Sequence, residues 1–411
     1  NGQQRIVQNR LPPLELPSSG LRVGAFALSA LSGAPRQIAI GGITLPTQRI
    51  VQQRDSQSHT TDQLRPKNCN GIFCRRAISE QPPGVHSTMT NRVVYYGPPD
   101  NPRTIMAADL APDDIDFGVV DPDLPWEERK ALLADTQILI LGGLALSTQE
   151  IAALPNLKLL QLMSAGYDRV DVPAVKELGV FVSNSSPQVA PAVSQHAIAL
   201  MLMVLNRIVP GVDGARDGSW ADTARSKPLF ELMGRTVGIV GLGNIGSLIA
   251  RRLIGFDCEL VYADPRAIPE VVERELNIRK VAFEELLGIS DVVTVHVPLY
   301  SGTRGMFNAE AFEAMKQTAI FINTCRGPVH DEADLIAALE SGEILAAGVD
   351  VVEEEPTNVS NPLLHMDNCV VTPHMAGSTE ERVQRALLSS YDNARRVMRG
   401  DTPTQQIDPL V

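Results

Sequence analysis

A glycine-rich turn at residues 241–246 carries the clearest chemical signal in this chain. Its sequence, G-L-G-N-I-G, follows the apolar run 237–240 and precedes an amphipathic run at 247–254. Between a strand and a helix, Gly241 permits a tight turn, Gly243 lets a pyrophosphate approach the backbone, and Gly246 lets helix and strand pack closely. The N–H groups at the start of such a helix attract an anion. The turn therefore predicts dinucleotide binding.

An acidic residue follows the next predicted strand. That strand covers 259–263 and ends at Asp264, which lies 18 residues after Gly246. At this spacing a carboxylate accepts hydrogen bonds from the adenosine ribose and repels a 2′-phosphate. Arg266, two residues further on, could attract such a phosphate. We therefore expect NAD as the cofactor, with NADP less favoured.

Five further motifs agree with this interpretation, and together with the turn they resemble the D-isomer-specific 2-hydroxyacid dehydrogenases. They are S-A-G-Y-D at 164–168, T-V-H-V-P-L at 294–299, N-T-C-R-G at 323–327, D-V-V-E-E-E-P at 350–356 and T-P-H-M-A-G at 372–377. The resemblance runs from about residue 92 to residue 398. It implies an NAD-dependent enzyme that transfers a hydride between NAD(H) and a small 2-hydroxy or 2-keto acid, and a homodimer.

The resemblance also implies three catalytic roles. Arg326 holds the carboxylate and carbonyl of the substrate, His374 moves the proton, and Glu355 orients His374. Physical chemistry supports each role. Imidazole is the side chain whose ordinary pKa suits both protonated and free forms near neutrality. A carboxylate on its other nitrogen fixes the tautomer, and a guanidinium binds a carboxylate through two parallel bonds.

The remaining site residues are expected to contact cofactor or substrate. The N–H groups of Ala165 and Gly166 complete the carboxylate cradle, and Asp350 accepts from the nicotinamide carboxamide. The further cofactor contacts are Asn244, Ile245, Val297, Pro298, Thr303 and Cys325. No metal site is expected.

Each of these side chains also has a simpler structural interpretation. His374 could be an ordinary loop residue, and Arg326 could pair with Asp331 or Glu332 across its loop. Cys325 could be a nucleophile, but hydride transfer needs no covalent intermediate. We therefore expect Cys325 only to occupy space beside Arg326, without a chemical role. We interpret His196 and His296 as hydrogen-bonded structural residues.

The chain departs from the family pattern at two places. Gln195 replaces a common glutamate at the domain junction, and N-S-S-P-Q-V at 184–189 lacks the commoner Pro-Gly pair. Of the properties that the resemblance implies, the identity of the substrate is the one that these two departures put most in doubt. We expect glyoxylate or hydroxypyruvate, because the chain from Met89 is compact and ends without an added regulatory domain.

Two alternatives remain, one from another functional class and one a different dehydrogenase that resembles this chain in fold. An NAD-sensing binding protein, like the carboxy-terminal-binding corepressors, would bind NADH and reduce none of the 2-keto acids. A formate dehydrogenase would be expected to carry glutamine where Glu355 stands.

The elements that position these motifs alternate between short apolar runs and amphipathic segments, which is typical of parallel α/β sheets. We expect strands at 93–96, 117–120, 137–141, 157–162 and 180–182, and six more at 237–240, 260–263, 292–296, 320–323, 345–350 and 370–371. Long helices are expected at 191–208, apolar around its circumference, and at 380–398. The fold class is therefore two doubly wound domains: a flavodoxin-like substrate domain (89–205 and 385–411) and a Rossmann NAD-binding domain (206–384).

Composition and charge exclude or disfavour several other classes of protein. The longest strictly apolar run, at 197–205, is about half of a membrane-spanning length of about 20 residues. A net charge of −12 disfavours nucleic-acid binding. Five scattered cysteines, with no ligands to complete a zinc site at Cys69 and Cys74, favour a reducing compartment. We expect a cytoplasmic protein with neither nucleic-acid nor membrane partners.

The first 88 residues differ from the rest. The first 90 carry ten Lys or Arg against four Asp or Glu and show no sustained periodicity, so we expect disorder. Two other interpretations stay open. The segment also resembles an organelle transit peptide, or it is upstream sequence that is not natively translated, because the first methionine is Met89.

Overall fold

The computed structural model describes residues 92–220 and 227–408. Within these residues the chain forms two separate parallel β-sheets flanked by helices, which confirms the predicted α/β class. The predicted N-terminal extension, with Cys69, Cys74 and Met89, lies outside the described residues. The predicted domain boundaries at 205/206 and 384/385 stay predictions.

The first sheet has five strands in the order β2-β1-β3-β4-β5, all parallel. This is the order of flavodoxin-like folds, in which the chain reverses direction across the sheet between β1 and β3. The strands are β1 (Arg92–Tyr96), β2 (Asp116–Val120), β3 (Ile138–Leu141), β4 (Leu159–Leu162) and β5 (Phe181–Ser183). The connecting helices are α1 (Pro102–Asp109), α2 (Trp126–Leu133), α3 (Thr148–Ala152) and α4 (Val172–Glu177).

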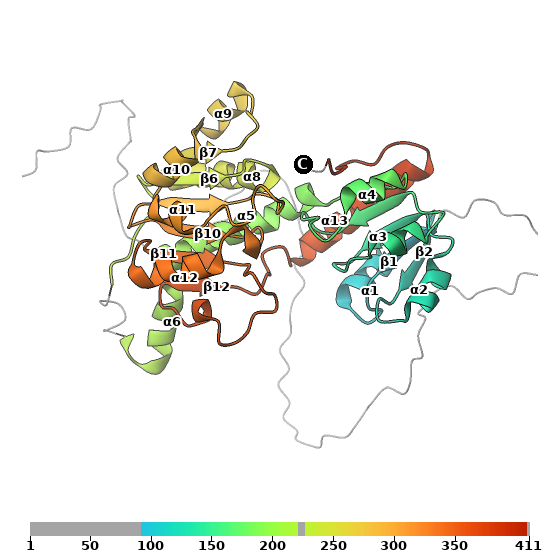
Figure 1. Cartoon of the computed structure of the whole chain (residues 1–411), viewed down its shortest axis with the longest axis horizontal. Coiled ribbons are helices and arrows are strands. Elements are labelled where there is room, and N and C mark those ends of the chain that lie inside the picture. The colour runs from blue at the N-terminus through green and yellow to red at the C-terminus, as the bar shows by residue number, and fades with distance from the viewer. Residues whose placement is uncertain (1–91, 221–226, 409–411) are drawn as a thin grey trace, which may run out of the picture. The chain divides into compact units, whose positions relative to one another are not determined.

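The predicted apolar helix is α5 (Ser186–Leu205), which begins five residues earlier and ends three residues earlier than predicted. Its length and hydropathy would suffice to cross a membrane, but 61% of its apolar window is buried inside the protein. It packs against α8, β10 and β11, which is the environment of a core helix (Figure 1). Arg207 adopts a left-handed φ of 49°, which ends α5 and starts a separate helix, α6 (Ile208–Asp217).

The second sheet has seven parallel strands in the order β12-β11-β10-β9-β6-β7-β8. Counted from β6, this is the Rossmann order with one added strand, and the chain reverses direction across the sheet between β6 and β9. The predicted six strands are therefore one too few. The missed strand, β8, has three residues at a sheet edge, and two of them are the exposed Arg279 and Lys280, so no apolar run marks it. The strands are β6 (Thr236–Val240), β7 (Glu259–Ala263), β8 (Ile278–Lys280), β9 (Val292–Val295), β10 (Ile320–Asn323), β11 (Ala346–Val349) and β12 (Cys369–Val371).

The helices between these strands are short, and the loops that join them to the strands include residues of the site. They are α8 (Asn244–Leu253), α9 (Glu270–Leu276), α10 (Phe283–Ile289), α11 (Ala309–Glu313) and α12 (Glu332–Ser341). Three short 3₁₀ turns supplement them: η1 (Ile254–Phe256), η2 (Gly327–Val329) and η3 (Pro362–Leu364).

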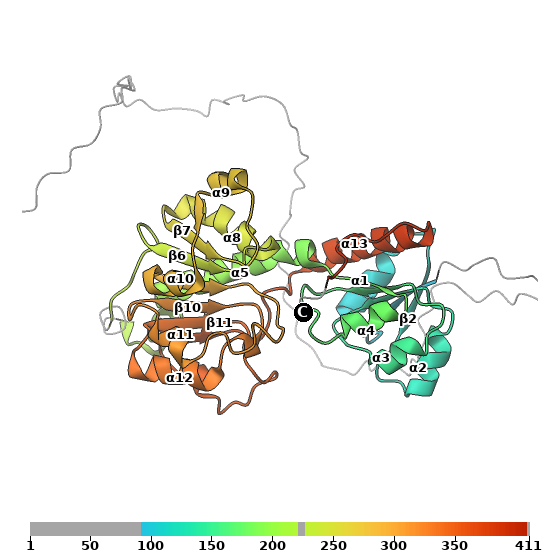
Figure 2. The same ribbon diagram turned by 45° about the horizontal axis from the view of Figure 1, so that its top comes forward.

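The final helix, α13 (Glu380–Met398), has the predicted bounds and packs on the first sheet. Its buried residues recur at helical spacing, so one face is apolar. Tyr391 on that face makes an edge-to-face contact with Phe117 of β2, and its hydroxyl donates to the Ala107 carbonyl of α1 at 2.5 Å. Figure 2 shows α13 running alongside α1. The chain therefore returns to its first sheet after completing the second.

Candidate active site

The glycine turn sits between β6 and α8 at the reversal point of the second sheet. Gly241 has a φ of +90°, and a Cβ there would lie 2.6 Å from the His296 carbonyl oxygen at the end of β9. A Cβ on Gly246 would overlap the Gly241 carbonyl oxygen. Gly243 has no atom within 4 Å of a built Cβ, and no side chain caps the N-terminus of α8. The turn thus leaves open space and free N–H groups where a pyrophosphate would bind. The residues fit a dinucleotide.

Asp264 lies beside this turn, as the spacing predicted. One carboxylate oxygen accepts from the Leu242 N–H at 2.9 Å, and the other accepts from the Arg266 N–H at 2.9 Å and the Arg266 Nε at 3.3 Å. Asp264 is 6% exposed and Arg266 is 76% exposed. The arginine that could attract a 2′-phosphate is therefore paired with the acid in this structure.

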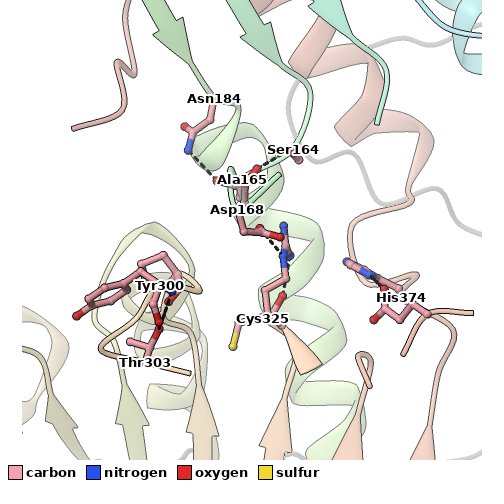
Figure 3. A network of polar contacts seen from close by, with 12 residues as sticks. Ser164, Ala165, Asp168, Asn184, Tyr300, Thr303, Cys325 and His374 are labelled. Carbon is pink, nitrogen blue, oxygen red and sulfur yellow. Dashed lines mark hydrogen bonds and ion pairs between the residues drawn. The ribbon is translucent and has the colours of Figure 1, made fainter. Parts of the chain in front are cut away.

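The predicted site residues gather around one cleft with a volume of about 1790 Å³. Gly246 alone of the predicted set does not line it, because it packs against Gly241 as described above. Thr303 holds the loop at 298–303, which lines the cleft. Its hydroxyl donates to the Pro298 carbonyl at 2.6 Å and accepts from the Tyr300 N–H at 3.1 Å (Figure 3). Asn244 donates to the Ser186 hydroxyl at 3.0 Å. The lining predicted residues are Ala165, Gly166, Gly241, Gly243, Asn244, Ile245, Asp264, Val297, Pro298, Thr303, Cys325, Arg326, Asp350, Glu355 and His374.

A carboxylate–imidazole pair stands on one wall of the cleft. His374 Nδ1 and Glu355 Oε2 are 2.6 Å apart, and the other Glu355 oxygen accepts from the Val352 N–H at 3.3 Å. Burial raises the pKa of Glu355, but His374, the Val352 N–H and the Arg326 charge outweigh it and hold this pKa below its ordinary value. Glu355 is therefore ionised at neutral pH and holds Nδ1, which leaves Nε2 for a reacting group.

Asp350 shapes the loop that carries His374. One of its oxygens accepts from the Thr372 hydroxyl at 2.6 Å and the Met375 N–H at 2.9 Å, and the other accepts from the Ala376 N–H at 2.8 Å. Asp350 is 1% exposed, and His374 itself adopts a left-handed φ of 48°. These bonds to a buried carboxylate fix the backbone that follows the imidazole and the Thr372 side chain that precedes it. The predicted contact of Asp350 with a nicotinamide carboxamide stays a prediction.

Arg326 follows β10 and is held by a partner that the sequence reasoning did not assign. Its Nε donates to Asp168 Oδ1 at 2.8 Å and its Nη1 donates to the Cys325 carbonyl at 2.7 Å. Figure 3 shows Asp168 and Cys325 together, with His374 on a separate loop. The suggested pairing of Arg326 with Asp331 or Glu332 is wrong, because Asp331 caps α12 and Glu332 accepts from the Glu353 N–H and the Asn361 side chain.

The loop at 164–168 lies against this guanidinium. A Cβ on Gly166 would overlap Arg326 Nη2, so only glycine admits the arginine in this position. The Ser164 hydroxyl donates to the Gly166 carbonyl at 2.7 Å, and the Asn184 side chain donates to the Ala165 carbonyl at 2.8 Å. Asp168, Ser164 and Asn184 were missed as site residues. The first two belong to a motif that the resemblance had already marked.

The rival histidines and the cysteine behave as interpreted. His196 Nε2 lies 2.9 Å from the Thr372 hydroxyl. His296 is the first residue after β9, and its Nε2 lies 2.8 Å from the Thr294 hydroxyl. Burial lowers the pKa of His296 to about 3, so it stays neutral. Burial raises the pKa of Cys325 to about 11, and its thiol donates to Asn323 Oδ1 at 3.0 Å. It is therefore a thiol, not a thiolate nucleophile.

Comparisons with known proteins agree with this geometry. A family model described as "D-isomer specific 2-hydroxyacid dehydrogenase, NAD binding domain" matches residues 198–376. The glyoxylate reductase of Thermofilum pendens is 37% identical over 263 residues, which cover 63% of this chain and 77% of that protein. Glyoxylate/hydroxypyruvate reductase B of Escherichia coli K12 is 35% identical over 289 residues, covering 69% and 88%. The holo structure of Rhodotorula graminis D-mandelate dehydrogenase is similar with a TM-score of 0.68 at 29% identity, covering 78% and 99%.

Proposed function

This chain belongs to the D-isomer-specific 2-hydroxyacid dehydrogenases and is an NAD-dependent enzyme, and from this premise we propose that it reduces a small 2-keto acid. In this proposal His374 is the acid/base, Glu355 orients His374, and Arg326 binds the substrate carboxylate. One observation carries the proposal. The Glu355–His374 pair and the Arg326 guanidinium line the same cleft as the glycine turn.

The cofactor supplies the hydride, and the protein must supply the proton. A carbonyl oxygen that gains negative charge needs a donor whose pKa lies near neutrality, and imidazole is suited to this. Because Glu355 holds Nδ1, His374 presents Nε2 to the substrate oxygen. In the reverse direction the same nitrogen accepts the proton of the 2-hydroxyl group.

Arg326 and the 164–168 loop orient the substrate. Asp168 and the Cys325 carbonyl hold Nε and Nη1, which fixes the plane of the guanidinium and leaves Nη2 beside Gly166. A carboxylate there receives charge-assisted bonds from Arg326 together with N–H groups of Ala165 and Gly166. Holding the carboxylate in this way would turn the adjacent carbonyl toward His374, so orientation contributes to the rate.

The first substrates to test are glyoxylate and hydroxypyruvate, because the two curated relatives described above are named for reducing them. Purified protein should oxidise NADH in the presence of at least one acid from a panel of glyoxylate, hydroxypyruvate, pyruvate and 3-phosphohydroxypyruvate, with NADPH in parallel. Binding of NADH with no turnover on the whole panel would contradict the proposal and favour an NAD-sensing binding protein. Formate oxidation with NAD would favour the formate dehydrogenase alternative.

A further inference from the structure

Two arginines and a serine line the same cleft, on its side nearer the first sheet, and the proposed chemistry does not use them. Arg103 lies in the first turn of α1, Arg382 lies in the first turn of α13, and Ser378 follows His374 by four residues. Arg103 Nη2 donates to the Ser378 hydroxyl at 3.2 Å, and the Ser378 N–H donates to the Met375 carbonyl at 2.8 Å. This cationic cluster of Arg103, Ser378 and Arg382 is therefore tied to the loop that carries His374.

The positive charges of this cluster have no carboxylate partner among residues 92–220 and 227–408. Arg382 Nε is buried without a hydrogen bond, and burial together with the nearby Arg103 charge lowers the pKa of Arg382 to about 10. Arg326 of the site and Arg395 of α13 are, by contrast, paired with carboxylates, Arg326 with Asp168 and Arg395 with Asp114. Two unpaired guanidiniums in a partly buried place repel each other, and a bound anion would offset that cost.

The position of the cluster also suits a ligand. In open α/β sheets, ligands bind outside the carboxyl ends of the strands where the strand order reverses, which in the first sheet is between β1 and β3. Arg103 belongs to the helix that follows β1, and Gly142 and Gly143 follow β3. A Cβ on Gly142 would lie 2.6 Å from the Tyr95 hydroxyl oxygen, whereas Gly143 faces open space and lines the cleft.

We propose that Arg103, Ser378 and Arg382 form an anion subsite for a second negatively charged group of the substrate, so the preferred substrates are 2-keto acids that carry a distal carboxylate or phosphate. The inference rests on the proposed function and deepens it. The first carboxylate binds at Arg326 and the keto group faces His374. The rest of the molecule extends along the His374 loop to Ser378 and the two guanidiniums. A 2-keto acid without a distal anion leaves both charges unpaired.

Two matched substrate pairs test the subsite. Hydroxypyruvate and 3-phosphohydroxypyruvate differ by one phosphate, and pyruvate and oxaloacetate differ by one carboxylate. With NADH, the full chain should show a kcat/KM at least about tenfold higher for the anionic member of one pair, mainly through a lower KM, since charged hydrogen bonds are strong. The pair that shows the difference identifies the group that the subsite takes.

Variants assign this preference to particular side chains. Arg382→Gln and Arg103→Gln should each reduce the ratio of kcat/KM within the responsive pair by about tenfold or more, and Arg382→Lys should fall between Arg382→Gln and the wild type. Arg385→Gln is the matched control, because Arg385 lies one turn further along α13, donates to the Gln188 carbonyl at 3.2 Å and does not line the cleft. It should keep the wild-type ratio. Two independent arginines keep the test valid if one variant fails to fold.

The outcomes separate the two proposals. If glyoxylate is reduced but both pairs show ratios of one or less, or if both glutamine variants keep the wild-type ratio, the subsite is refuted and the proposed function stands. If no 2-keto acid is reduced, the proposed function fails, and inorganic phosphate then decides the subsite by thermal shift. A rise in melting temperature that Arg382→Gln abolishes supports an anion site, and no rise refutes it.

Discussion

Replacing Gly166 by alanine tests the proposed carboxylate cradle with a single methyl group. The added Cβ would overlap Arg326 Nη2 and Cζ and would lie 3.0 Å from Asp168 Oδ1. To regain a van der Waals separation of about 3.5 Å, the guanidinium must withdraw by about 2 Å. Such a movement breaks the 2.8 Å bond between Arg326 Nε and Asp168. A misplacement of about 1 Å can cost about 10²-fold in rate, so we expect kcat/KM to fall by at least that factor.

The assay measures kcat and KM for glyoxylate with NADH, together with the Kd of NADH by fluorescence. The glycine turn belongs to the other sheet, so NADH affinity should stay within about threefold, well under the 1.4 kcal/mol of a tenfold change. Gly211→Ala is the matched control, because Gly211 lies in α6 and no atom lies within 4 Å of its built Cβ. That variant should keep its activity and should be no less stable than the wild type, because alanine is favoured over glycine inside a helix.

Retention of most of the activity by Gly166→Ala would refute the assignment of Arg326, because the arginine could not then occupy its present position. An equal loss of NADH affinity and of thermal stability would also contradict the reasoning. In that case the damage is to the fold and not to the substrate cradle.

Three other outcomes follow from the contacts of the site. Glu355→Gln should lower kcat by about 10²-fold. The pKa of Glu355 in the folded protein is below its ordinary value, so its pair with His374 stabilises the fold when the pH is above that ordinary pKa. This stabilisation is lost as the pH falls through the lowered pKa of the folded protein. The gap in melting temperature between wild type and Glu355→Gln should therefore be widest at neutral pH and close in acid. Asp350→Ala removes the acceptor of the Met375 and Ala376 N–H groups and should lower the free energy of unfolding in urea by about 2 kcal/mol or more, with loss of activity. Cys325→Ser should keep kcat within about threefold, since burial raises the pKa of Cys325 to about 11; a much larger loss would support a chemical role for the thiol.

Local pattern in the sequence predicted the elements whose signals are strong. The glycine turn was identifiable because the strand before it, the helix after it and the spacing of its glycines all lie within about 20 residues. The helix at 380–398 has the predicted bounds because its apolar face repeats at helical spacing. The strand β8 was missed because a three-residue edge strand with two exposed charges has no apolar run. The end of the long apolar helix was predicted three residues too late because the left-handed Arg207, not hydropathy, determines where it ends.

By itself the sequence determined the α/β class, the dinucleotide turn and the residue types available for proton transfer and carboxylate binding. Only the tertiary structure decided which side chains meet. Asp168 and Arg326 are 158 residues apart in the chain and form an ion pair because β4 and β10 end at the same cleft. Asp350 became the anchor of the His374 loop, and Arg103 came to lie beside Ser378 and Arg382, through the order of strands in two sheets. Periodicity encodes the face of an element that is buried, whereas strand order and the return of the last helix arise from packing between distant segments.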